Sequence, residues 1–277
     1  MNKPKTLYIS DLDNTLLNSD SVLSDYTKNT LNELISKGID FTVATGRTTD
    51  AAQQIMSDVE LNIPIVSFNG VVIYSTKEKR CEKVFWLSTK TVIKIVNVLK
   101  SHGVLFLMYE YKDNELIAYY ESLEHEPISD FIRDRKARYN SAFSQVGSFG
   151  DVSAEHIMYF TLKDTYDRIK PVYDVMKKVA NINIALVDDT SIDGLWWLEI
   201  FSADASKENA VKFLRAEYGY NKVVGFGDNY NDLPMFKACD ICVAVKNALS
   251  EVIAAADYIC DTNDNDGVAK WLKEKSI

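Results

Sequence analysis

Short apolar runs alternate with amphipathic segments along the first seventy residues. The run Thr6–Ser10 is apolar and ends at an acidic cluster, which is typical of a buried strand in a parallel sheet. Ser24 can cap a following helix, and Gly38 can end that helix in a left-handed turn. The pattern then predicts a helix through Met56 and further strands at 39–44, 64–68 and 71–74, the last two joined by a hairpin at Asn69-Gly70.

The C-terminal part repeats this alternation. Lys207 begins an amphipathic segment that Gly219 closes, and apolar runs follow at 222–226 and 241–245. Strands that alternate with helices favour a parallel sheet covered by helices on both faces. The sequence therefore predicts an α/β fold with a Rossmann-like core.

The middle of the chain has a different order of elements. A helix at 88–101 precedes two strand candidates, and a helix at 166–179 precedes two more; the segment 124–151 is polar and yields no clear element. We interpret this region as an α+β domain inserted into the core. The predicted division is a core of residues 1–84 and 199–277, and a cap of residues 85–198.

Composition and net charge limit the classes of molecule that this protein is expected to bind. The 277 residues are 47% hydrophobic and 26% charged, with a formal net charge of -9, as in an ordinary globular protein that nucleic acid or an anionic membrane surface would repel. A small phosphorylated molecule could still bind at a local positive site. The sequence does not indicate an oligomeric state.

The N-terminus and the cysteines point to the cytoplasm. The first apolar run is too short for a signal peptide or an anchor. Cys239 and Cys242 form a Cys-x-x-Cys pair, but a zinc site needs two further ligands and the histidines lie far away in sequence. We expect buried, reduced thiols and a cytoplasmic location.

Two acids follow the first strand. Asp11 and Asp13, separated by one residue, could belong to an ordinary turn. They could also divide the work of a phosphoryl transfer: one carboxylate attacks phosphorus, while the other protonates the leaving oxygen and later takes a proton from water. Alone, the pair leaves these two interpretations about equally open.

Three more segments carry polar groups to strand ends or helix starts, where ligands of open α/β sheets bind. Thr45-Gly46-Arg47 can donate to a phosphoryl oxygen, although a capping turn is also possible and Arg47 could pair with an acid instead. Lys207 begins a helix against the helix dipole, which neutralisation of a phosphate and a carboxylate would explain. The loop from Gly227 to Asp232 contains Asp228, which with Asp11 would supply the carboxylates that Mg²⁺ prefers.

In this order and spacing, the four segments resemble the haloacid dehalogenase (HAD) superfamily, and the large middle insertion is similar to that of its Cof-type members with a subclass IIB cap. The Asp-x-Asp-x-Thr start and the Gly-Asp-x-x-Asn-Asp loop are the specific motifs. The resemblance implies a Mg²⁺-dependent phosphatase that forms an aspartyl phosphate. It implies the following roles: nucleophile Asp11; general acid/base Asp13; metal ligands Asp11, Asp13 (main-chain carbonyl) and Asp228; phosphate binding by Leu12, Thr45, Gly46, Lys207 and Asn231; and Asp232 in support of the loop or of Lys207.

Two positions depart from the family pattern, because Asn14 and Glu208 stand where relatives often have glycine. Neither change removes a reacting group. The expected substrate is a small phosphorylated metabolite, such as a sugar phosphate or a flavin-related phosphate. A sugar-phosphate mutase is the alternative enzyme, and a phospho-acceptor signalling module is a third, non-catalytic alternative.

Overall fold

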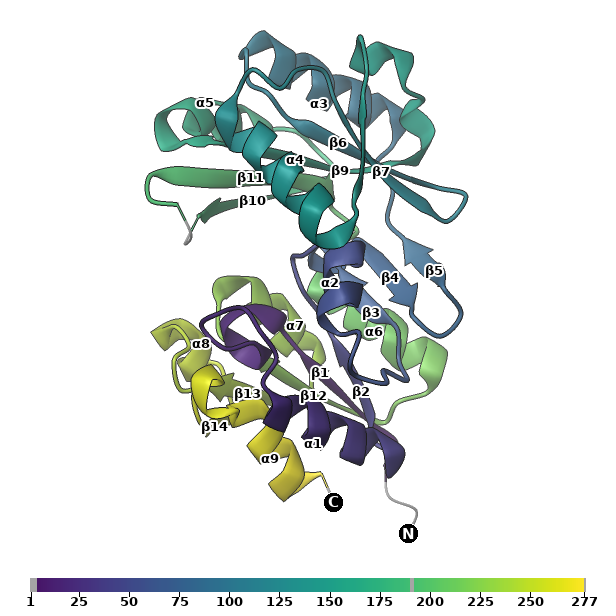
Figure 1. Cartoon of the computed structure of the whole chain (residues 1–277), viewed down its shortest axis with the longest axis vertical. Coiled ribbons are helices and arrows are strands. Elements are labelled where there is room, and N and C mark those ends of the chain that lie inside the picture. The colour runs from purple at the N-terminus through teal and green to yellow at the C-terminus, as the bar shows by residue number, and fades with distance from the viewer. Residues whose placement is uncertain (1–3, 190–191, 277) are drawn as a thin grey trace. The chain divides into compact units, whose positions relative to one another are not determined.

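The computed structural model describes residues 4–189 and 192–276 and separates into two compact units. The first unit comprises Met1–Lys83 and Ser206–Ile277, and the second comprises Val84–Ala205. Figure 1 follows the chain through both. Within the described residues, no helix combines the length and the apolar character that crossing a membrane requires.

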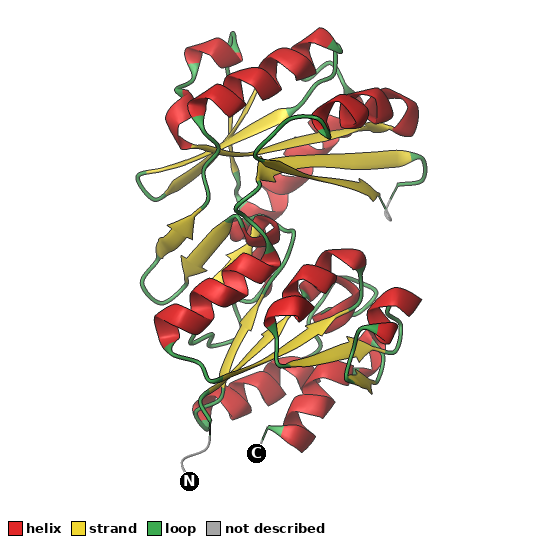
Figure 2. Cartoon of the chain, turned by 180° about the vertical axis from the view of Figure 1, so that it is seen from behind, coloured by secondary structure: helices red, strands yellow, loops and turns green. Residues whose placement is uncertain are grey.

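A parallel sheet forms the centre of the first unit, with the strand order β14-β13-β12-β1-β2. Its strands alternate with helices along the chain, and Figure 2 shows helices on both faces of the sheet, as the alternating pattern predicted. The strands are β1 (Thr6–Ser10), β2 (Asp40–Val43), β12 (Lys222–Gly227), β13 (Ile241–Val245) and β14 (Tyr258–Cys260); the helices are α1 (Asp25–Ser36), α2 (Thr49–Ile55), α6 (Lys207–Tyr218), α7 (Leu233–Ala238), α8 (Ser250–Ala254) and α9 (Gly267–Lys275).

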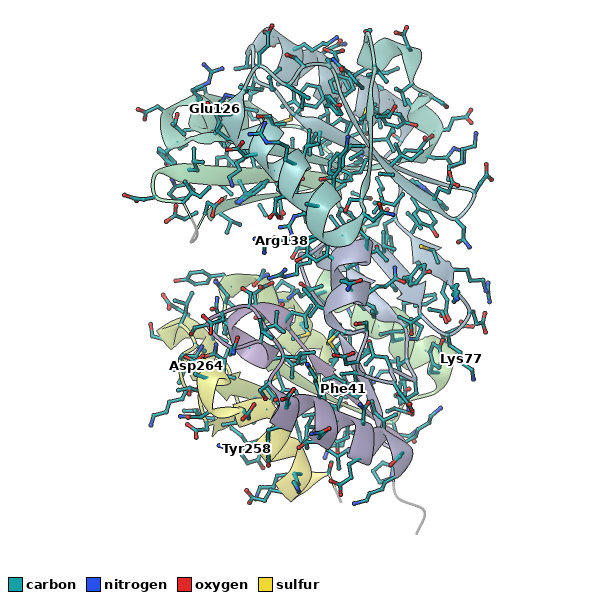
Figure 3. The ribbon with its side chains drawn as sticks, in the orientation of Figure 1. Phe41, Lys77, Glu126, Arg138, Tyr258 and Asp264 are labelled. Carbon is teal, nitrogen blue, oxygen red and sulfur yellow. The ribbon has the colours of Figure 1, made fainter. Side chains whose placement is uncertain are left out.

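Alternation along β1 places a hydrophobic cluster on each face of the sheet, because successive strand side chains point to opposite sides. Leu7 and Ile9 join a cluster with residues of α6, α7 and α8. Tyr8 joins the other cluster, which includes residues of α1, α2 and α9 and the fully buried Phe41, labelled in Figure 3. The sheet is therefore buried on both faces, and only its ends are open to polar chemistry.

The predicted hairpin forms a small second sheet, of order β3-β4-β5. Its strands are β3 (Ile65–Ser67), β4 (Val72–Ser75) and β5 (Arg80–Val84). A parallel bridge between Ala44 and Val66 joins it to the segment that follows β2. The hairpin turn thereby lies close to the end of β2.

The second unit has a sheet of order β10-β11-β9-β6-β7-β8, in which only the pair β7–β8 is parallel among the described residues. Helices α3 and α5 contribute to a cluster with Phe160, Leu162 and Leu198 on one face. The bounds are α3 (Thr89–Ser101), β6 (Leu107–Lys112), β7 (Glu115–Tyr120), α4 (Glu126–Tyr139), β8 (Ala142–Gln145), β9 (Ile157–Thr165), α5 (Tyr166–Met176), β10 (Ile182–Asp188) and β11 (Leu195–Ser202).

Two features of this unit differ from the sequence interpretation. The polar segment 124–151 contains α4 and β8, which the sequence pattern did not separate because α4 carries many charged side chains. The second unit also extends to Ala205, seven residues beyond the interpreted boundary at 198. The reason is β11, which pairs with β9 as far as Phe201, so that residues 199–202 continue the same strand.

Candidate active site

The candidate site lies at one edge of the first sheet, where the neighbouring parallel strands β12, β1 and β2 end. The register aligns Ser10 with Val43 on one side and with Phe226 on the other. The Asp11 N–H continues this ladder by donating to the carbonyl of Phe226 over 2.9 Å. Since parallel strands end at the same edge, the segments after β1, β2 and β12 meet there. This is the arrangement expected from the sequence.

The chain turns sharply after Asp11. Residues Leu12–Leu16 form a π-helical turn in which Asp13 is extended and Asn14 is left-handed, with φ of 57°. The Leu17 N–H closes the turn onto the Leu12 carbonyl at 2.8 Å. Asparagine is one of the few residues that adopt this backbone conformation at low cost, so Asn14 can occupy this position without a glycine's freedom.

Lys207 lies between two acids in the interior. Its Nζ is 2.5 Å from Asp11 Oδ1 and 2.7 Å from Asp232 Oδ1, and the lysine is only 2% exposed. Ser206 caps α6 by accepting from the Asn209 N–H at 3.0 Å, which fixes where the helix begins. Burial opposes the charge on Lys207, but the two carboxylates outweigh burial and raise its pKa. Lys207, which the sequence alone would allow at the surface, is therefore buried as the counter-ion of Asp11 and Asp232.

Asp232 uses both of its oxygens to hold neighbouring groups. Oδ1 accepts from Lys207, and Oδ2 accepts from the N–H groups of Asp228 at 2.9 Å and Asn229 at 3.1 Å. The side chain packs so closely on Gly227 that a Cβ there would lie 2.6 Å from the Asp232 Cβ. Asp232 thus holds both the loop and the lysine, the two supporting contacts that the resemblance implied as alternatives.

Three buried carboxylates form a candidate metal centre. Oxygens of Asp11, Asp228 and Asp232 all lie within 4.8 Å of one another. Burial, reinforced by Asp232, raises the pKa of Asp228 to about 7, and burial likewise raises the pKa of Asp11 although Lys207 opposes the change. One lysine cannot balance three acids, so the cluster suits a hard divalent cation with oxygen ligands.

The hydrogen bonds of the three carboxylates indicate which of them could bind a metal ion and which supports its neighbours. Because both Asp232 oxygens already accept hydrogen bonds, Asp11 and Asp228 are better suited to hold a cation. Asp228 also accepts from the Thr15 hydroxyl at 2.9 Å, which orients its carboxylate. The sequence motif included Thr15, but sequence reasoning assigned it no role.

Arg47 pairs with Asp13, one of the two alternatives that the sequence left open. Its Nε is 2.9 Å from Asp13 Oδ2, and its terminal nitrogen is 2.5 Å from Oδ1. Such a two-pronged contact fixes the carboxylate in orientation as well as position. Asp13 remains partly open to solvent, with 42% of its side chain exposed. A bound molecule can therefore contact this carboxylate.

The residues implied in phosphate binding lie around this edge. Thr45 is fully buried, and its hydroxyl accepts from the Arg47 N–H at 3.1 Å. Leu12 is buried at the start of the π-helical turn. Gly46 lies against the side chain of Asn69. Asn231 is exposed in the turn Tyr230–Asp232.

Sequence reasoning missed a second function for the hairpin turn. Phe68, Asn69 and Gly70 all have positive φ, and a Cβ on Gly70 would lie 2.3 Å from the backbone carbon of Ser206. The Asn69 N–H also donates to the Thr45 carbonyl at 2.9 Å. The turn therefore contacts both the segment after β2 and the start of α6. The Asn-Gly pair was a visible signal, but it was interpreted only as a hairpin.

Of the two cysteines in the Cys-x-x-Cys pair, Cys242 is buried and Cys239 is half-buried. Cys242 is buried and donates to the Phe236 carbonyl at 3.3 Å, and burial raises its pKa to about 11. Cys239, at the end of α7, is also a free thiol. In the described part of the chain, the acidic cluster of Asp11, Asp228 and Asp232 is the one group of side chains with metal-ligand spacing.

A family model for haloacid dehalogenase-like hydrolases matches residues 8–272. The chain belongs to this family. The predicted fold, with its Rossmann-like parallel-sheet core and additional α+β domain, and the predicted enzyme class, a phosphatase of the haloacid dehalogenase type, are confirmed at this level.

Known relatives cover almost the whole chain. A 5-amino-6-(5-phospho-D-ribitylamino)uracil phosphatase of Bacillus subtilis, YitU, is 25% identical, and the match covers 95% of each chain. The pyridoxal phosphate phosphatase YbhA of Escherichia coli is 23% identical with the same coverage. A crystal structure of a haloacid dehalogenase-like hydrolase from Bacteroides thetaiotaomicron superposes with a TM-score of 0.82 at 24% identity, over 98% of this chain and 99% of that one.

Proposed function

We propose that this HAD enzyme is a Mg²⁺-dependent phosphatase that hydrolyses phosphate monoesters of small metabolites through an aspartyl phosphate on Asp11. The observation that carries the proposal is the position of Asp11. It lies at the end of β1, 2.5 Å from the buried Lys207 and within the same carboxylate cluster as Asp228. The proposed nucleophile, a buried lysine and a second acid therefore lie together at one sheet edge.

In the first step, a carboxylate oxygen of Asp11 attacks phosphorus while the bond from phosphorus to the ester oxygen breaks. Asp13 gives its proton to that departing oxygen. In the second step, water attacks the phosphorus of the aspartyl phosphate and gives a proton to Asp13. Inorganic phosphate leaves, and both carboxyl groups return to their starting states.

The remaining residues bind and orient. Lys207 offsets negative charge on the transferring group, which is the main catalytic requirement of phosphoryl transfer. Leu12, Thr45, Gly46 and Asn231 are proposed to donate to phosphate oxygens. Asp11, Asp228 and the main-chain carbonyl of Asp13 would hold Mg²⁺, which supplies electrostatic stabilisation of the phosphate oxygens when bound.

The substrate class follows from the relatives. YitU and YbhA both act, by name, on phosphate esters of small heterocyclic metabolites, so a small phosphorylated metabolite, including a sugar phosphate, is the proposed substrate. The proposed location is the cytoplasm, where reducing conditions would keep thiols such as the buried Cys242 and Cys260 reduced.

The decisive experiment is phosphate release from a panel of phosphate esters with Mg²⁺ present. Wild-type enzyme should release phosphate, whereas Asp11→Asn should be inactive and should retain its fold. Asp20→Asn, which changes an exposed acid nearby in sequence, serves as the matched control. Substantial turnover by pure Asp11→Asn would exclude Asp11 as the nucleophile. Isomer formation without net phosphate release would identify a mutase instead.

A further inference from the structure

Asn247 joins two loops of the first unit, although no motif drew attention to it. It follows β13, and its side-chain amide donates to the carbonyl of Asn14 at 2.8 Å. Its side-chain oxygen accepts from the N–H of Asn263 at 3.0 Å. A carbonyl can only accept and a backbone N–H can only donate, so these two partners fix a single orientation of the amide.

The loop after β14 holds the residues that directly follow the same turn. Asn263 is buried, and its side-chain amide donates to the Leu17 carbonyl at 3.0 Å. Asp264 accepts from both the N–H and the hydroxyl of Ser19 at 2.7 Å. In Figure 1 these C-terminal residues, in yellow, lie beside the purple segment after β1, and Figure 3 labels Asp264 there. Side chains from the C-terminal third of the chain thus hold the π-helical turn at its middle, through Asn14, and just past its end, through Leu17 and Ser19.

The hydrogen bond between Asn247 and the Asn14 carbonyl affects the backbone next to Asp13. Asn14 has left-handed backbone dihedrals directly after the extended Asp13. Any rotation of the peptide that follows Asn14 changes the direction in which the chain leaves Asp13. The hydrogen bond from Asn247 opposes that rotation. The loop that contains Asn247 is itself joined to the loop that contains Asp228, because the Leu249 N–H donates to the Asp228 carbonyl at 2.9 Å.

We propose that Asn247 is a positioning residue that holds Asp13 in place as the proton donor to the leaving group. The inference rests on the proposed function. It gives Asn247 no contact with substrate: the residue acts through the Asn14 carbonyl. A competing role is support of the metal site, because the same turn carries Thr15, whose hydroxyl binds Asp228.

Leaving-group chemistry separates these roles. An alkoxide needs a proton as it departs, whereas p-nitrophenolate departs readily without one. With either ester, kcat/KM covers the steps from substrate binding through phosphoryl transfer to Asp11 and excludes hydrolysis of the aspartyl phosphate. Misplacement of Asp13 should therefore slow hydrolysis of an alkyl phosphate much more than that of p-nitrophenyl phosphate. Damage to the metal site should slow both equally.

The test compares Asn247→Leu and Asn247→Asp with wild type on p-nitrophenyl phosphate and on an alkyl phosphate that the wild type hydrolyses. Asn247→Leu removes both hydrogen bonds. Asn247→Asp keeps the acceptor for Asn263 but faces the Asn14 carbonyl with oxygen. Both should lose about tenfold in kcat/KM on the alkyl phosphate, the order of one hydrogen bond, and less than about twofold on the aryl phosphate.

Two controls complete the design. Thr15→Val should raise the Mg²⁺ concentration for half-maximal rate and slow both esters to the same degree. Lys246→Ala changes an exposed neighbour in the same loop and should behave as wild type.

Equal loss on both esters in the Asn247 variants, or no loss on either, overturns the inference. Full activity of Asp11→Asn overturns the proposed function instead. The two failures are therefore distinguishable.

Discussion

Substitutions at two acids of the cluster should affect stability in opposite ways. In the metal-free protein, Asp232→Asn should destabilise the first unit, whereas Asp11→Asn should leave its stability unchanged or increase it. The reason is that Asp232 binds Lys207 and the backbone N–H groups of Asp228 and Asn229. Asp11, in contrast, is a buried carboxylate whose pKa burial raises well above its usual value.

The size of the effect follows from these contacts. An asparagine at 232 offers one acceptor oxygen, so either Lys207 or the two N–H groups lose their partner. Lys207 keeps Asp11, so the cost is about 2–3 kcal/mol, that of hydrogen bonds to a charged group, rather than that of an orphaned ion. For a unit of about 150 residues this lowers the Tm by roughly 4–12 °C.

At Asp11 the raised pKa sets the sign of the pH dependence. Its carboxyl group binds a proton more readily in the folded than in the unfolded protein, so the charge it carries at high pH disfavours folding. Asp11→Asn removes that charge, while its amide oxygen can still accept from Lys207. The advantage of Asp11→Asn over wild type should therefore be largest at high pH and should shrink as the pH falls.

Scanning calorimetry in the presence of a chelator measures both effects, at pH 8 and again at pH 5. The outcome that refutes the reasoning is a Tm for Asp232→Asn within about 2 °C of wild type at pH 8, or a lower Tm for Asp11→Asn than for Asp232→Asn. The first result would mean that the contacts of Asp232 do not support the fold, and the second would mean that the Asp11 carboxylate stabilises the fold despite its burial.

Three further results are expected. Arg47→Lys loses the two-pronged contact with Asp13 and should lower kcat/KM about tenfold or more without unfolding the enzyme; steady-state kinetics matching wild type would contradict this. Gly70→Ala places a Cβ 2.3 Å from the Ser206 backbone and should lower both Tm and activity. Gly38→Ala, also at positive φ but with open space around it, should lower the free energy of unfolding by only about 1–2 kcal/mol. Similar losses of Tm in the two variants would argue against a role for the hairpin turn at Gly70. Mg²⁺ binding should weaken below about pH 7, the raised pKa of Asp228, because a proton then competes with the cation, by up to about tenfold per pH unit; calorimetric titrations at pH 8 and pH 6 that agree would contradict it.

The alternatives that the sequence left open were decided by contacts between distant segments. Lys207 could have been a surface lysine, and Arg47 could have faced a phosphate. The structure buries Lys207 between Asp11 and Asp232, and pairs Arg47 with Asp13. Neither pairing can be inferred from spacing, because the partners of Lys207 are 196 and 25 residues away in sequence.

Local pattern by itself determined the core elements and the approximate place of the chemistry. The run Thr6–Ser10 coincides with β1, Ser24 caps α1, and Gly219 ends α6 with φ of 68°, because buried strands, caps and left-handed turns depend on a few adjacent side chains. The segment that became α4 was missed because its many charged side chains obscure the apolar pattern, and its contact between Phe131 and Trp197 joins segments that are distant in sequence.

Only the tertiary structure decided which side chains stabilise the candidate site. Asn247 and Asn263 lie in loops more than 200 residues from the turn that they hold, and asparagine in a loop carries no distinguishing sequence signal. Their role arises because a parallel sheet brings the carboxyl ends of its strands to one edge, where loops from both ends of the chain meet. Residue types and spacing can identify the reacting groups; the hydrogen bonds that orient them depend on the folded sheet.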